Sequence, residues 1–204
     1  MPSFFESLQS IDQNLFVYIN RVATHPILDT LMPFFRESTF WIPFYLFLIV
    51  FVFVNFGKKG WVWLLFAFIT VLLTDQLSSS IIKNWVQRPR PCADPLFSNQ
   101  VRLLLDHCSG GYSFTSSHAT NHFGVATFLF VTLGRFFGSW KYLLFIWAAL
   151  ICYAQVYVGV HYSFDVIFGA LLGFAIGILV SRLGIPSFVV TLAAFLMFQG
   201  LLLL

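Results

Sequence analysis

Charged residues are scarce in this chain. Only 9% of its 204 residues are Asp, Glu, Lys or Arg, whereas 59% are hydrophobic and the mean hydropathy is +0.85. Soluble domains carry about 25% charged residues, because their surfaces face water. The composition therefore excludes an ordinary water-soluble fold and predicts that most of the chain faces a lipid bilayer.

Excess positive charge is also lacking. The net charge is +3, and the 11 basic residues are scattered between apolar blocks. A nucleic-acid-binding surface needs a dense basic face to neutralise phosphates, so we expect no nucleic-acid partner. The opening residues, MPSFFESLQS, have neither the basic start nor the short apolar run of a cleavable signal peptide. We expect the internal spans to direct membrane insertion.

The period-two alternation that marks β-strands is missing as well. Long apolar runs are present instead, and six of them approach the roughly 20 residues that cross a hydrocarbon core. These runs cover residues 40–56, 61–82, 116–133, 142–158, 164–180 and 186–204. The sequence therefore predicts an all-α fold, a polytopic membrane helix bundle of about six transmembrane helices.

The N-terminal part is less uniformly apolar. Polar residues interrupt it at Asp12, Arg21, His25 and Asp29. This pattern favours one or two amphipathic helices lying in the membrane interface, with a tilted seventh crossing as the alternative. We expect a single membrane-embedded domain that divides into interfacial helices in residues 1–38, a core carrying the motifs in 61–180 and a last span in 186–204.

Loop charges predict the orientation. Basic residues without acidic partners occupy one set of connections: Lys58, Lys59, Arg135, Lys141 and Arg182. By the positive-inside rule these connections are cytoplasmic. The long connection 83–115 and the turn around His161 then face outward.

Ionisable groups at membrane helix ends are costly and are functional candidates for that reason. Here they occur in three separate places: Lys83, Arg88 and Arg90 after the second span, Ser116, Ser117 and His118 at the start of the third, and His161 and Asp165 between the fourth and fifth. Counting crossings puts all three places on the same side of the membrane. We therefore expect them to form one site.

The residue types suit phosphoryl transfer. Lys83 and Arg90 are candidates for binding phosphate oxygens, the lysine as a point charge and the arginine as a two-pronged donor. Ser116 and the amides at the start of the third helix offer a further anion site. His161 and Asp165 are one helical turn apart, so the carboxylate can hold one ring proton and free the other nitrogen to attack phosphorus. His118 can protonate the leaving oxygen and later activate water.

These residues lie in three motifs: KNWVQRPRP at 83–91, SFTSSHA at 113–119 and VYVGVHYSFD at 156–165. The motifs resemble, in order, the three signatures of the type 2 phosphatidic acid phosphatase family, whose core is shared by vanadium haloperoxidases. The resemblance covers roughly residues 61–180. It implies a phosphatase without metal or other cofactor, a phosphohistidine intermediate at His161, His118 as the acid, and Lys83, Arg90 and Ser116 as the phosphate grip.

The resemblance also implies a substrate class and a location. The family includes phosphatases of undecaprenyl pyrophosphate, phosphatidylglycerophosphate and lipid A. We expect hydrolysis of a phosphomonoester or pyrophosphate on a membrane lipid of the undecaprenyl pyrophosphate, phosphatidylglycerophosphate or phosphatidate class. The expected location is a bacterial cytoplasmic (inner) membrane, with the site facing the periplasm or the outside. The oligomeric state stays open.

The sequence departs from the family pattern in two places. In the second motif, Thr115 and Ser117 replace a proline and a glycine. In the third motif, Ala154 and Gln155 replace a Ser-Arg pair, so a phosphate-binding arginine is missing. Gln155 can still donate an N–H, and Arg88 is a candidate source of the lost charge. The departure motivates an alternative function, a lipid-phosphate binding or transport protein without turnover.

Other features permit further interpretations. His118, His122, His161 and Asp165 suggest a zinc or iron site, although the nearby cationic residues favour an anion. Cys92 and Cys108 both fall in the outward loop, where a disulfide is an open question. Asp75 and Gln76, inside the second span, are interpreted as a polar pair that bonds a neighbouring helix. Gly169, Gly173 and Gly177, at four-residue spacing, predict a close helix–helix contact.

Overall fold

The computed structural model of the chain describes residues 4–183, and every regular element in that range is a helix. The elements that carry the argument below are α1 (Phe4–Val17), α2 (Pro26–Phe35), α3 (Ile42–Phe56), α4 (Gly60–Asp75), α5 (Lys83–Val86), α6 (Ser117–Phe137), α7 (Leu143–Tyr157) and α8 (Ser163–Leu183). The π-helical segment Gln76–Ile82 joins α4 to α5 without a break, so Lys83 lies on a helix and not at the start of the loop.

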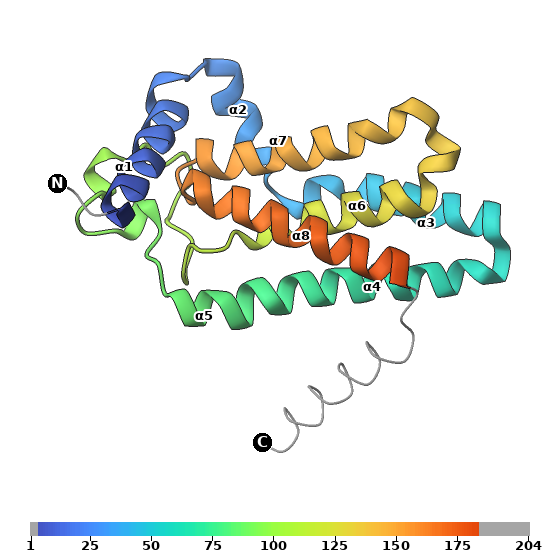
Figure 1. Cartoon of the computed structure of the whole chain (residues 1–204). Helices are drawn as coiled ribbons and strands as arrows, with labels where there is room; N and C mark the ends of the chain where they lie inside the picture. The colour runs from blue at the N-terminus through green and yellow to red at the C-terminus, as the bar shows by residue number, and fades with distance from the viewer. Residues whose placement is uncertain (1–3, 184–204) are drawn as a thin grey trace.

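Three helical stretches are long and apolar enough to cross a membrane: Ser38–Ala93, Ser117–Tyr157 and Ser163–Arg182. The first two double back on themselves, α3 into α4 and α6 into α7 (Figure 1). Each reversal passes through a glycine with positive φ, Gly57 at +54° and Gly138 at +52°, a conformation that only glycine adopts without strain. The predicted span 186–204 lies outside the described residues, so the count of six stays a prediction.

Helices α6 and α8 form the centre of the bundle because glycines allow their backbones to touch. A Cβ atom at Gly173 would lie 2.1 Å from the Thr120 carbonyl oxygen, and one at Gly177 would lie 2.6 Å from the Gly124 carbonyl oxygen. Gly169 approaches the Ser116 carbonyl in the same way. The close helix–helix contact predicted from the glycine spacing is confirmed.

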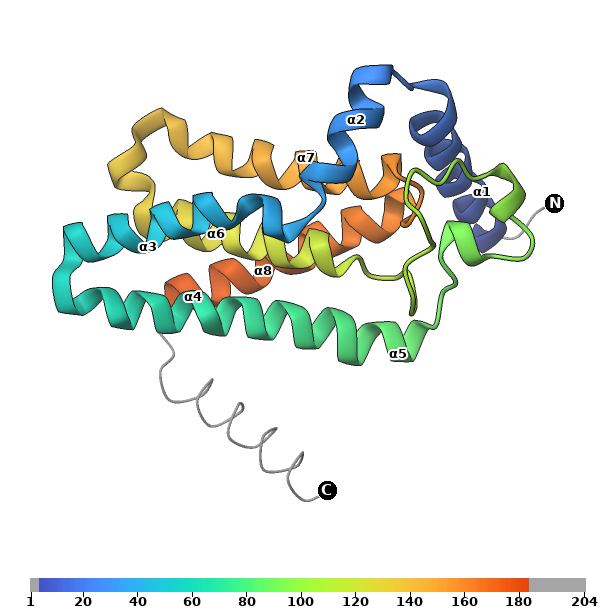
Figure 2. The same ribbon diagram turned by 180° about the vertical axis from the view of Figure 1, so that it is seen from behind.

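Helices α1 and α2 cover the end of the bundle where α5 ends and α8 begins (Figures 1 and 2). The Phe16 side chain of α1 is fully buried, with its ring 5.6 Å from both Phe97 and Tyr162. The Asp29 carboxylate of α2 accepts hydrogen bonds from Arg102 at 2.9 Å and from Tyr157 at 2.5 Å. The N-terminal helices therefore close one end of the bundle, and their predicted position in the membrane interface stays a prediction.

Candidate active site

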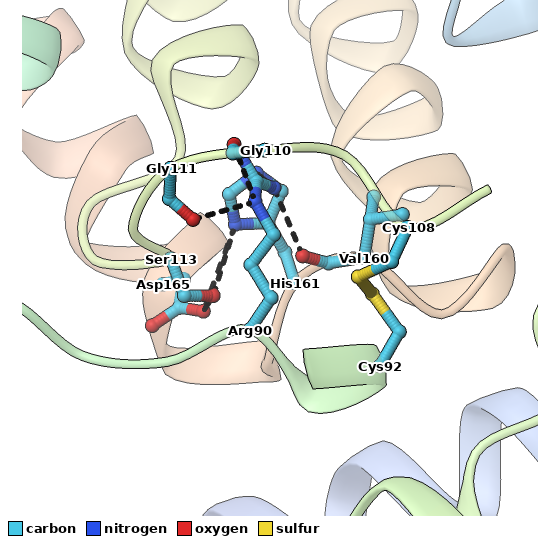
Figure 3. Close-up of a disulfide and its surroundings, with 9 residues drawn as sticks. All are labelled: Arg90, Cys92, Cys108, Gly110, Gly111, Ser113, Val160, His161 and Asp165. Atoms are coloured by element: carbon cyan, nitrogen blue, oxygen red, sulfur yellow. Dashed lines mark hydrogen bonds and ion pairs between the residues drawn. A yellow bond between two sulfur atoms is a disulfide. The ribbon is translucent and has the colours of Figure 1, made fainter. Parts of the chain in front are cut away.

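The site forms where the turn between α7 and α8 meets the loop that follows α5. His161 occupies this turn, and its side chain is 2% exposed. The His161 Nε2 atom lies 3.0 Å from an Arg90 guanidinium nitrogen (Figure 3). Because guanidinium can only donate, Nε2 must be the accepting nitrogen of the ring, and in the neutral ring the proton is then on Nδ1.

Asp165 and Ser113 face the other ring nitrogen of His161 (Figure 3). An Asp165 carboxylate oxygen lies 3.6 Å from Nδ1, and the Ser113 hydroxyl lies 3.4 Å from it. Ser113 also donates a short hydrogen bond to that oxygen, which accepts a second bond from the Tyr162 amide at 2.9 Å. The expected pairing of Asp165 with His161 is therefore present, with the Ser113 hydroxyl as an additional contact.

The His161 ring is neutral at physiological pH. Burial lowers the pKa of His161 to about 4; Asp165 opposes this effect, and the positive charge of Arg90 adds to it. A neutral imidazole has a lone pair available for attack, so this environment suits a nucleophile.

Arg90 is fixed by backbone carbonyl groups. Its guanidinium donates to the carbonyls of Gly110 at 3.2 Å and Gly111 at 3.3 Å, and to that of Val160 at 3.1 Å. The loop that supplies the two glycines is tied to the Arg90 segment by a disulfide between Cys92 and Cys108, with 5.8 Å between their Cα atoms (Figure 3). The sequence left open whether Cys92 and Cys108 are paired, and the structure shows that they form a disulfide.

Arg88 has a different set of partners. Its guanidinium donates to Asp165 at 2.8 Å and to Asp12 of α1 at 2.7 Å, and it lies 4.0 Å from the centre of the Tyr162 ring. Asp12 is fully buried and also accepts from the Phe164 amide at 2.8 Å. Burial raises the pKa of Asp12, an effect that Arg88 opposes. Arg88 therefore bridges two carboxylates. Both compete with phosphate for the Arg88 guanidinium, which was expected to contribute to phosphate binding.

The second motif begins α6. The Ser116 hydroxyl caps the helix by accepting from the Ala119 amide at 3.4 Å, and the Ser116 amide donates to the Asp165 carbonyl at 3.0 Å. The Ser117 hydroxyl lies 2.8 Å from that of Ser79. The second and third motifs are thus joined directly through the backbone, which places the N-terminus of α6 beside Asp165.

His118 faces a cavity of about 430 Å³ between α3, α4 and α6. The cavity is lined by Ser38, Tyr45, Val71, Asp75, Ser117, His118, Asn121, His122 and Val125. A second cavity of about 290 Å³, almost entirely apolar, shares Tyr45, Val71 and Val125 with the first. The two cavities therefore adjoin, and together they run from His118 between α3, α4 and α6.

Lys83 and Gln155 each have polar atoms without partners. Within residues 4–183 the Lys83 ammonium makes no hydrogen bond or ion pair. Gln155 is fully buried in the last turns of α7, and neither its amide nitrogen nor its amide oxygen has a hydrogen-bond partner in that part of the chain. A buried amide without partners costs free energy, so the Gln155 side chain is an unsatisfied polar group in the interior of the bundle.

The metal interpretation gains no support from the described residues. Across residues 4–183 there is no group of three or more His, Cys, Asp or Glu side chains that could hold a metal ion. The His122 ring instead contacts the His118 carbonyl at 2.7 Å and the Tyr45 hydroxyl at 3.4 Å. Asp75 accepts from Asn121 of α6 at 3.4 Å, as expected for a polar residue that bonds a neighbouring helix.

Comparison with known proteins identifies the family of the chain. The family model of the PAP2 superfamily matches residues 60–186, which include all three motifs. The chain belongs to the PAP2 superfamily. It is 34% identical to a lipid A 4'-phosphatase of Porphyromonas gingivalis over 84% of this chain and 72% of the relative. It is 30% identical to phosphatidylglycerophosphatase B of Bacillus subtilis over 61% of this chain and 59% of that protein.

Two solved structures share the fold. The crystal structure of Aquifex aeolicus LpxE matches with a TM-score of 0.61 and 30% identity, over 82% of this chain and 92% of that one. A transmembrane PAP2 phosphatidylglycerolphosphate phosphatase from Bacillus subtilis matches with a TM-score of 0.62 and 25% identity, over 87% and 86%. The resemblance inferred from the motifs is confirmed: this PAP2 protein is an integral-membrane, metal-independent phosphatase of lipid phosphate metabolism.

Proposed function

We propose that this PAP2 protein hydrolyses a phosphomonoester or pyrophosphate on a membrane lipid through a phosphohistidine intermediate at the outer membrane face. The observation that carries the proposal is the buried, neutral His161 ring. Its Nδ1 proton faces Asp165 and Ser113, and its Nε2 lone pair faces Arg90.

In the first step Nε2 of His161 attacks phosphorus and the bond from phosphorus to the lipid oxygen breaks. Asp165 stabilises the positive charge that develops on the ring. His118 donates a proton to the departing lipid oxygen, which leaves as an alcohol, or as a lipid phosphate when the substrate is a pyrophosphate.

In the second step water attacks the phosphorus of the phosphohistidine. His118, now neutral, accepts a proton from the water, and the bond from phosphorus to Nε2 breaks. Inorganic phosphate leaves, and both histidines return to their starting protonation states. One water is consumed for each phosphate released, so no other reactant is needed.

Cationic and polar donors hold the phosphate group during both steps. Arg90 exchanges its contact with Nε2 for a phosphate oxygen, and Lys83 brings an ammonium that has no competing partner within residues 4–183. The amides at the N-terminus of α6, from Ser117 onward, add donors and the positive end of the helix dipole. The Gln155 amide, buried without a partner, takes the position of the family arginine.

The lipid portion extends from His118 into the two adjoining cavities. The outer cavity of about 430 Å³ has polar residues such as Asp75, His118 and Asn121 in its lining, whereas the lining of the inner one of about 290 Å³ is almost entirely apolar. This change in lining suits a polar head followed by an apolar tail.

Two features support an outward-facing site in a bacterial cytoplasmic membrane. The basic residues of the α3–α4 and α6–α7 turns lie at the end of the bundle opposite the site (Figures 1 and 2), as the positive-inside rule requires. The disulfide beside the site also belongs in an oxidising compartment.

Phosphate release by the purified protein in detergent tests the proposal. We expect release that continues in the presence of a chelator, and an acid-labile, base-stable phosphoenzyme in quenched reactions. His161→Gln should abolish both. His107→Gln is the matched control, because His107 is exposed in the loop and should retain full activity. Tight phosphate binding with no turnover of any lipid phosphate would instead favour the binding protein that Gln155 motivates.

A further inference from the structure

The cavity beside His118 contains hydrogen-bond acceptors that the chemistry above does not use. Asp75 of α4 and Asn121 of α6 both line it. One Asp75 carboxylate oxygen accepts from the Asn121 amide nitrogen at 3.4 Å and from Ser79 at 3.0 Å. The two residues therefore form a polar pair across the cavity wall.

The orientation of this pair follows from its chemistry. A carboxylate only accepts, so the nitrogen of the Asn121 amide must face Asp75 and the amide oxygen must point elsewhere. That oxygen is buried and has no donor among the described residues. Across residues 4–183 the second carboxylate oxygen of Asp75 has no hydrogen-bond donor either. The wall thus contains two acceptors without donors, one of them on an anionic group.

These acceptors lie in the cavity that the leaving group must enter. His118, the proposed proton donor to the lipid oxygen, lines the same cavity, and Asn121 is three residues further along α6, on the same face of the helix. Atoms attached to the departing oxygen must therefore enter the space between His118 and Asp75. The phosphate group itself stays with Arg90 and Lys83.

We propose that this cavity is a leaving-group site that selects lipids whose phosphate is carried by a neutral, hydroxyl- or amide-bearing group such as a sugar. The inference rests on the proposed function and narrows its substrate class. Donor groups on a sugar satisfy the free acceptors of Asp75 and Asn121, which an acyl glycerol cannot do. A pyrophosphate substrate releases an anion, which the Asp75 carboxylate repels.

The rates of phosphate release from three lipids test this selection. The lipids are lipid A carrying a 4'-phosphate, whose leaving group is a sugar; phosphatidic acid, whose leaving group is neutral and lacks donors; and undecaprenyl diphosphate, whose leaving group is anionic. The full-length protein in mixed micelles should show kcat/KM falling in that order, with about tenfold between successive substrates.

Two variants separate the contributions of Asp75 and Asn121 to substrate selection. Asp75→Asn keeps the shape and an acceptor but removes the charge, so it should raise kcat/KM for undecaprenyl diphosphate relative to phosphatidic acid about tenfold. Asn121→Leu should lower kcat/KM for lipid A relative to phosphatidic acid by a similar factor. Gln76→Leu is the matched control, because Gln76 follows Asp75 on the same helix but is exposed and does not line the cavity; it should leave both ratios unchanged.

Different results would overturn different claims. A wild-type preference for undecaprenyl diphosphate, or ratios that neither variant changes, would refute the leaving-group site and leave the proposed function standing. If Asp75→Asn does not fold, the wild-type order and Asn121→Leu decide the question. Failure of the wild-type protein to hydrolyse any of the three lipids would refute the proposed function, and this inference with it.

Discussion

His161 has neighbours with opposing electrostatic effects, and the balance sets its protonation. Burial and Arg90 favour the neutral ring, whereas Asp165 favours the charged one. The sequence indicated the pairing with Asp165 from the four-residue spacing alone. It gave no sign of the Arg90 contact or of the depth of burial, because both depend on how the loop after α5 folds back over the turn at His161.

The first prediction concerns the titration of His161. Its pKa of about 4 lies below the ordinary value near 6.5, so the ring should stay neutral as the pH falls from 7 to 5 and become protonated only near pH 4. Histidine-labelled protein in detergent, followed by NMR, reports this titration, and His161→Gln assigns the signal. A midpoint near 6.5 would contradict the described environment.

The lowered pKa of His161 also makes the stability of the folded protein depend on pH. An unfolded chain has His161 at its ordinary pKa and therefore binds a proton below about pH 6.5, which the folded chain does not do until about pH 4. The contribution of His161 to the free energy of unfolding therefore decreases as the pH falls through this window, and is fully present above it.

The second prediction concerns Ser113. Its hydroxyl contacts both Nδ1 of His161 and the Asp165 carboxylate, so Ser113→Ala should leave the ring less well oriented and lower kcat about tenfold with little change in KM. Steady-state kinetics checks this. Ser109→Ala, in the same loop, is the control and should retain the wild-type kcat. A change confined to KM would place Ser113 in substrate binding instead.

At the scale of elements, helix contacts position the site. The glycine spacing on α8 predicted a close contact from sequence, since small residues four apart form one face of a helix. The contact between α1 and the site was not predictable in that way. Asp12 and its partner Phe164 are 152 residues apart. From sequence, a single carboxylate in an amphipathic segment is expected to face solvent.

The third prediction concerns the contact between α6 and α8. A methyl group at Gly173 would lie 2.1 Å from the Thr120 carbonyl oxygen, so Gly173→Ala must push the helices apart and should lower the free energy of unfolding by about 1–3 kcal/mol. Thermal unfolding in detergent measures this as a lower Tm. Gly134→Ala is the control, because its methyl would meet only the flexible Lys141 side chain. Equal Tm values for the two variants would refute the prediction.

The fourth prediction concerns the docking of α1. Asp12→Asn leaves the partly buried Arg88 with one carboxylate instead of two, and loss of a partner from an ion pair whose carboxylate is buried costs about 3 kcal/mol. We expect a lower Tm and faster proteolysis within α1. Asp106→Asn, an exposed acidic residue of the loop, is the control. Unchanged proteolysis would show that the Asp12–Arg88 pair does not hold α1 in place.

For the whole molecule, the sequence predicted the all-helical membrane fold and the meeting of three motifs, because apolar run lengths and the order of crossings determine both. Lys83, Arg90, Ser116, His118, His161 and Asp165 occur in those motifs. The sequence could not predict contacts made by loops, such as those of the carbonyl groups around Arg90. These contacts depend on backbone paths that have no periodic pattern in the sequence.

The fifth prediction concerns the orientation of the whole molecule. A membrane-impermeant maleimide added to bacterial spheroplasts should label Asn99→Cys, in the loop beside the site, and should label Lys58→Cys only after the membrane is opened. Both positions are exposed, and the native Cys152 is buried, so background labelling should be low. The reverse pattern would place the site in the cytoplasm.

The disulfide between Cys92 and Cys108 has a consequence for how the protein matures. Sixteen positions separate the two cysteines, and the carbonyl groups that orient Arg90 come from Gly110 and Gly111, just beyond the closed ring. A freshly translated chain can insert all its apolar helices before this ring exists. On the proposed outward orientation, the phosphate-binding site is complete only after the loop has been exported and its thiols have been oxidised, so a newly synthesised copy is inactive until then.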